Sequence, residues 1–151
     1  MRLTTIAALL LLADSAWGMS VDDAYASIPH RRTVFDRRAA TMPADEADAL
    51  QRLFAIVDRA IVARVTKSGY EPLLAELRAF DVPSRLRRVH TLVAEAVLAE
   101  HAYLTRNEPG AVQTASARLH EAYAELMRLF PDESPHNRDA FFDYLCALDF
   151  L

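Results

Sequence analysis

The sequence contains a single cysteine, Cys146, and this limits both its stabilisation and its chemistry. One cysteine cannot form an intrachain disulfide, and it cannot supply the Cys-x-x-Cys-His motif that attaches haem covalently. The fold must therefore be stabilised by packing, which a chain of this length can achieve because it buries roughly two-thirds of its unfolded surface. Cys146 lies between Leu145 and Ala147, and these apolar neighbours favour a buried, unreactive thiol over a reactive or dimer-forming one.

Glycine is also scarce, with three residues in the chain of 151, and no segment alternates apolar and polar residues between turn signals. Such a chain offers little from which to build a β-sheet. Apolar residues instead recur at three- and four-residue steps, which predicts an all-α fold, an antiparallel bundle of four to five helices with an extended N-terminal arm. The first expected helix begins at residue 44 and ends at Ser68-Gly69. Three more helices span 71–80, 84–105 and 111–130, and the last begins at residue 134.

Basic residues do not outnumber acidic ones, because 17 Lys and Arg stand against 21 Asp and Glu for a net charge of −4. This balance argues against a non-specific nucleic-acid binder, whose affinity would need a basic face. Lysine is almost absent, with Lys67 as the one example, a bias typical of a GC-rich bacterial genome.

The first residues have the three-part layout of a secretory signal. Arg2 gives a positive start, residues 6–13 form an apolar run, and Ala16 and Gly18 supply the small side chains that a signal peptidase needs three places and one place before the cut. Asp14 interrupts the run well before the roughly 20 apolar residues that a transmembrane helix requires. The sequence therefore predicts a cleavable signal peptide over residues 1–18, no stable membrane insertion after cleavage, and a periplasmic or secreted bacterial protein.

Residues 19–43 are predicted to form an N-terminal arm, and residues 44–151 the helical bundle domain. The arm lacks sustained periodicity and contains Pro29 and Pro43, so we expect a short helical turn over residues 21–27 followed by extended chain.

The centre of the arm has two interpretations. In the favoured one, Ile28, Val34 and Phe35 fill the open end of the bundle while the arginines pair with acidic residues of the helices. In the other, the arm docks onto an anionic or protein partner, because arginine makes bidentate contacts with carboxylates. The partner-binding residues would then be His30, Arg31, Arg32 and Phe35.

Three histidines on predicted helices, His90, His101 and His120, are the candidates for metal or haem binding. His90 and His101 share a helical face but lie about 16 Å apart along the axis at 1.5 Å per residue, too far to bind one ion. When the helix that carries His120 pairs with the one before it, His120 lies between His90 and His101 along the bundle axis, but more than a helical turn from each. Neither Glu-x-x-His nor His-Glu-x-x-His is completed at any of these three histidines, although non-covalent haem with His or Met ligands stays open.

No catalytic motif is present, because the sequence lacks a Gly-x-Ser-x-Gly turn and a phosphate-binding loop. The sequence therefore predicts a non-enzymatic exported protein that binds a protein or a small ligand and needs no cofactor. The alternative is a haem- or metal-binding four-helix bundle with histidine ligands. No feature indicates an oligomeric state.

Overall fold

The computed structural model describes residues 18–151, and every regular element in them is helical. The all-α prediction is confirmed. The predicted signal peptide falls, apart from its last residue, outside the described residues. The α-helices are α2 (Val21–Ala26), α3 (Ala44–Thr66), α4 (Tyr70–Ala79), α5 (Arg87–Arg106), α6 (Ala111–Leu129) and α7 (Pro135–Cys146), with short 3₁₀ helices η1 (Arg37–Ala39), η2 (Ser84–Leu86) and η3 (Ala147–Phe150).

Left-handed backbone conformations and a side-chain cap mark several of the helix boundaries. Lys67 adopts the left-handed conformation (φ 58°) after α3, and Asn107 does so (φ 46°) after α5. Gly110, with φ 77°, precedes α6, and a positive φ of this kind is tolerated best by glycine. The Ser134 side chain caps α7 by accepting the Asn137 N–H at 3.3 Å, and Pro135 occupies the first helical position.

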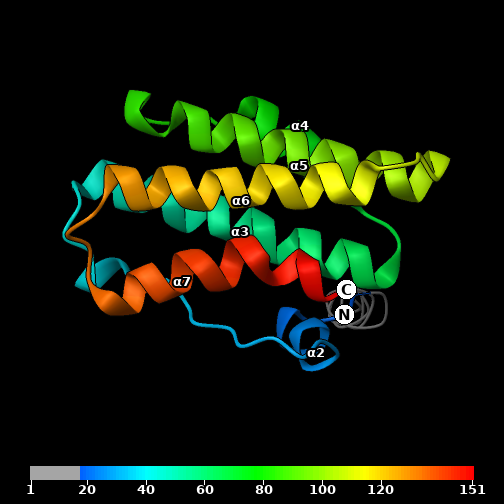
Figure 1. The fold of residues 1–151 in the computed structure, drawn as a ribbon, viewed down its shortest axis with the longest axis horizontal. Helices are drawn as coiled ribbons and strands as arrows, with labels where there is room; N and C mark the ends of the chain where they lie inside the picture. Colours follow the sequence, from blue (N-terminus) through cyan, green and yellow to red (C-terminus); the bar gives the residue numbers. More distant parts are fainter. Residues whose placement is uncertain (1–17) are drawn as a thin grey trace, which may run out of the picture.

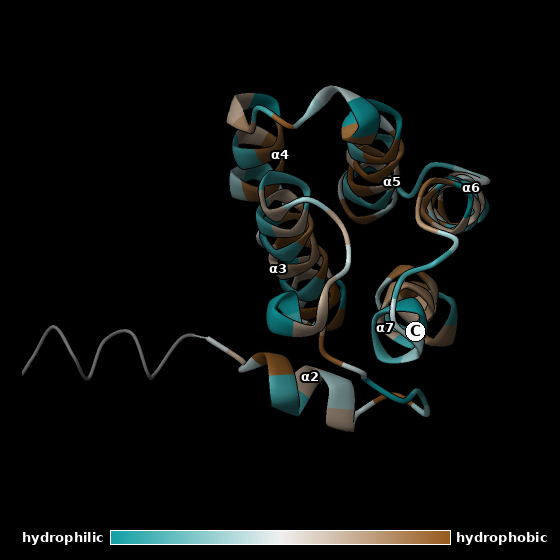
Figure 2. Cartoon of the chain, turned by 90° about the vertical axis from the view of Figure 1, so that its left-hand side faces the viewer, coloured by the Kyte–Doolittle hydropathy of each residue, from teal (hydrophilic) through white to brown (hydrophobic). Residues whose placement is uncertain are grey.

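The five longer helices surround one hydrophobic interior, as the end-on view in Figure 2 shows. α5 and α6 are antiparallel neighbours joined by a short turn, and α3 lies behind them, in contact with α4, α5 and α7 (Figure 1). In the core, Phe54 of α3 stacks on Tyr144 of α7 with ring centroids 4.5 Å apart. Among residues 18–151, no helix combines the length and the apolar character that crossing a bilayer would require.

The arm lies against the bundle and contributes to its core. α2 packs on α3, and the extended chain that follows runs along α7 (Figure 1). Ile28 and Phe35 are buried, as expected, but Val34 is 50% exposed, so its predicted burial is wrong. The reason is the extended backbone, in which successive side chains point to opposite sides. Thr33 and Phe35 face inward, and Val34 between them faces out.

Candidate functional site

Arg32 is held in a buried polar cluster that joins the arm to α3. Its guanidinium Nη2 donates to Asp58 Oδ2 at 2.8 Å, and the Tyr25 hydroxyl donates to Asp58 Oδ1 at 3.1 Å. The guanidinium also lies over the Tyr25 ring. Burial raises the pKa of Asp58, while Arg32 and Tyr25 oppose that rise. The charge of Arg32 is therefore used inside the protein, and Arg32 is not a free partner-binding residue.

His30 and Phe35 are likewise engaged in holding the arm. His30 Nε2 donates to the backbone carbonyl of Asp143 at 2.8 Å, and its ring stacks on Phe150 at 4.5 Å between centroids. Phe35 packs between the rings of Phe54 and Phe141. Of the four predicted partner-binding residues, these two and Arg32 support the fold.

Side chains of α7 and of the turn before it accept hydrogen bonds from the backbone of the arm. Thr33 N donates to Asp143 Oδ2 at 2.8 Å, and Asp36 N donates to Asn137 Oδ1 at 2.8 Å. Glu133 accepts the backbone N–H groups of Thr41, Met42 and Ser134, and also the Asn137 side-chain amide. Burial raises the pKa of Glu133, but these hydrogen bonds outweigh it and lower the pKa overall. The ionised carboxylate of Glu133 is thus the form that binds the N–H groups of the arm.

Arg31, the fourth predicted partner-binding residue, faces a cavity at the surface. This cavity, of about 340 Å³, lies between the arm, α6 and α7, and it has an apolar wall and several charged groups. The lining residues are Arg31, Tyr123, Met127, Pro135, Arg138, Asp139, Phe142 and Asp143. Phe142 is exposed and meets Tyr123 edge to face.

The two guanidiniums of this cavity have no carboxylate partner among the described residues, whereas Arg32 has two. The Nε of Arg138 is buried and makes no hydrogen bond within the described part of the chain. Asp143 already accepts the Thr33 N–H, which leaves Asp139 as the other acid of the lining. The cavity therefore holds two guanidiniums and two carboxylates that form no ion pair with one another, next to an aromatic surface.

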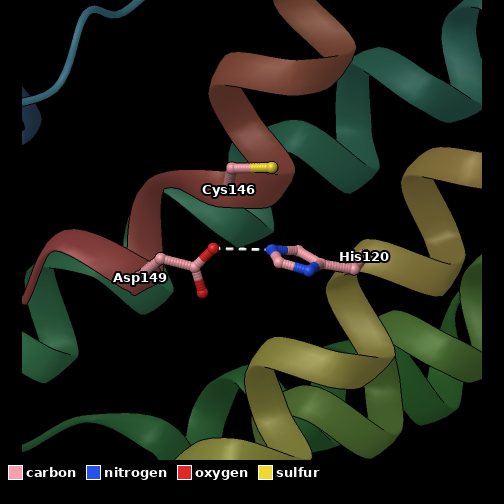
Figure 3. Close-up of side chains that lie close together, drawn as sticks. All are labelled: His120, Cys146 and Asp149. Carbon is pink, nitrogen blue, oxygen red and sulfur yellow. Dashed lines mark hydrogen bonds and ion pairs between the residues drawn. The ribbon is translucent and has the colours of Figure 1, made fainter.

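A second group of polar side chains gathers where α6 meets the C-terminal turn. His120 of α6 donates from Nε2 to Asp149 Oδ2 at 2.6 Å, and Ser116 donates to Asp149 Oδ1 at 2.6 Å. Cys146, at the end of α7, lies beside this pair (Figure 3). Burial, with the nearby charges of Asp149 and Asp143, raises the pKa of the Cys146 thiol to about 11. At neutral pH this group is a thiol rather than an activated nucleophile.

The three predicted histidine ligands do not come together. His90 Nε2 donates to the Leu77 carbonyl of α4 at 2.8 Å, and its ring meets Phe80. His101 lines a separate cavity beside Lys67–Pro72. Of the three, His120 alone belongs to a group of potential metal ligands in the described part of the chain, together with Cys146 and Asp149.

Sequence reasoning missed Asp149 and favoured a buried, unreactive thiol at Cys146. Their spacing, Cys-x-x-Asp, places both on one side of a helical turn, but α6 must lie opposite that turn before His120 can join them. Arg138 was missed because a lone arginine on α7 has no sequence signal that separates it from a surface charge.

No family model, no curated protein and no solved structure matches this chain.

Proposed function

We propose that this chain is an exported, non-enzymatic binding protein whose ligand is a small organic acid with an apolar group. The observation that carries the proposal is the cavity between the arm, α6 and α7, where Arg31 and Arg138 lie beside Tyr123 and Phe142 and have no carboxylate partner within residues 18–151.

The chemistry of the lining fits a carboxylate joined to a hydrocarbon. Guanidinium groups bind carboxylates through charge-assisted, often bidentate hydrogen bonds. Aromatic and thioether side chains provide the apolar contact, here from Tyr123, Phe142 and Met127. A volume of about 340 Å³ is within the range of small-molecule pockets, at their lower end.

Export is the second part of the proposal and rests on the sequence of residues 1–18. We expect a bacterial host to secrete the chain across its inner membrane and to remove this segment, so that the mature protein begins at Met19. Mass spectrometry of the periplasmic protein measures this directly. Full-length protein retained in the cytoplasm would contradict it.

The ligand can be tested with a matched pair of probes, 3-phenylpropionate and the neutral 3-phenylpropionamide. These differ in charge but share the aromatic group and the chain length. We expect the acid to bind at least about tenfold more tightly, because hydrogen bonds to charged groups contribute about 1.5–3 kcal/mol and tenfold corresponds to 1.4 kcal/mol.

Two variants and a control locate the site. Arg31→Gln and Arg138→Gln should each weaken binding of the acid and leave the amide almost unchanged. Arg78→Gln removes an exposed guanidinium from α4, which does not line the cavity, and should bind the acid as the unmodified chain does. Equal binding of acid and amide, or an equal loss in all three variants, would refute the proposal.

A further inference from the structure

We propose that His120, Cys146 and Asp149 form a binding site for one Zn²⁺ ion, separate from the organic-acid cavity. The three side chains come from α6, the end of α7 and η3, and they converge around one point (Figure 3). One ligand atom from each residue lies within 4.8 Å of the other two.

The donor set selects the kind of metal. An imidazole nitrogen, a thiolate sulfur and a carboxylate oxygen are the three ligand types that zinc uses in proteins. Calcium and magnesium prefer oxygen ligands alone, so a thiolate disfavours them.

Zinc binding requires a small movement of the ligand atoms. Tetrahedral zinc with bonds of about 2.0–2.3 Å separates its ligand atoms by roughly 3.3–3.6 Å. His120 Nε2 and Asp149 Oδ2, which share a proton at 2.6 Å, must therefore move apart by on the order of 1 Å. Both residues are at the surface, which leaves their side chains room to move. Zinc would take the place of the shared proton, the neutral His120 imidazole would then carry its proton on Nδ1, and the Cys146 thiol would release its own proton to solvent on binding.

The surroundings supply a supporting group and an open position. Ser116 donates to Asp149 Oδ1, which orients the carboxylate and leaves Oδ2 for the metal, as supporting residues of metal sites do. His120, Ser116 and Asp149 also line a cavity of about 520 Å³. A water molecule in this cavity could complete the tetrahedron, and three protein ligands with one exchangeable position is the arrangement of accessible zinc sites.

The test uses the purified chain, first stripped of metal with a chelator, and Zn²⁺ or Co²⁺ alone as the probe. We expect one ion per chain by calorimetry with Zn²⁺, and a thiolate-to-cobalt charge-transfer absorption with Co²⁺. His120→Ala and Asp149→Asn should weaken binding by more than about tenfold, because loss of a group that only supports a ligand already costs about that factor. Cys146→Ser should abolish the charge-transfer absorption.

Because Cys146 is buried, its replacement can disturb folding, and His120→Ala keeps the test independent of that risk. His101→Gln is the matched control, because this histidine lies in another cavity and should leave the affinity unchanged. Ser116→Ala should weaken binding by a smaller factor than His120→Ala. Binding below one ion per chain, a cobalt complex without the thiolate absorption, or an equal loss in His101→Gln would overturn the proposal.

Discussion

Arg31 and Arg32 are neighbours in the arm, but their surroundings are opposite. Arg32 turns toward α3 and gives its charge to the buried Asp58, while Arg31 turns toward the surface cavity and has no carboxylate partner in residues 18–151. The inner side of the arm thus has the polar and apolar contacts that hold it on the bundle. On the outer side, Arg31 forms no ion pair within residues 18–151. Two adjacent residues with the same side chain can therefore differ completely, one holding the arm on the bundle and the other being, under our proposal, a ligand-binding residue.

The largest effect is expected inside the core, at Phe35. Phe35→Ala leaves a cavity between Phe54 and Phe141 and should lower the free energy of unfolding by about 3–5 kcal/mol. Val34→Ala is the control one residue away, and it should cost less than about 0.5 kcal/mol because Val34 is exposed. Urea unfolding of both variants measures the difference. Similar losses would mean that the arm has no inner and outer side.

Arg32→Ala should lower the free energy of unfolding by about 3 kcal/mol at neutral pH, because Asp58 is then buried without its guanidinium. Burial already raises the pKa of Asp58, and loss of Arg32 raises it further. Protonation of Asp58 relieves the penalty, so the loss of stability should shrink as pH falls through the raised pKa. Urea unfolding at neutral and mildly acidic pH checks this sign, and a loss that grows toward low pH would contradict it.

Glu133→Gln should cost about 1–2 kcal/mol at neutral pH, because an amide accepts the arm's N–H groups less well than a carboxylate does. The pKa of Glu133 is lowered in the folded protein, so its contribution is present above the unfolded pKa and disappears as pH falls through the folded one. The two proteins should therefore converge in stability in acid. Denaturant midpoints over a pH series would reveal this convergence, and a constant gap would show that the charge of Glu133 plays no part.

The smallest effect on stability is expected at Arg31. Arg31→Gln should change the free energy of unfolding by less than about 0.5 kcal/mol, because the residue is exposed and forms no ion pair with the described residues. Its loss should appear in the affinity for 3-phenylpropionate instead. If Arg31→Gln destabilised the protein as much as Arg32→Ala, the two arginines would share a structural role.

The helices could be predicted from the sequence because their limits are set by local chemistry. Ser134-Pro135 starts α7 and Gly110 precedes α6, and the helical bounds agree with the expected ones to within a few residues. In the arm, the sequence predicted that Ile28 and Phe35 would be buried, but hydrophobicity alone could not show that Val34 faces out.

The candidate site was less accessible to sequence reasoning. Arg31 and Arg32 have the same side chain in adjacent positions, and only the docking of the arm distinguishes them. The cavity combines Arg31 with Arg138, which is more than a hundred residues away, and the histidine–cysteine–aspartate group likewise needs the packing of α6 against the C-terminal turn. Contacts of this kind depend on tertiary structure and leave no local pattern.

The ligand-binding role of the cavity can be tested by a ¹H–¹⁵N NMR titration of the chain with 3-phenylpropionate. We expect shift changes concentrated around Arg31, Tyr123, Arg138 and Phe142, and much smaller changes with 3-phenylpropionamide. Changes that are absent, centred elsewhere, or equal for the acid and the amide would contradict the assignment of this cavity as a binding site for organic acids.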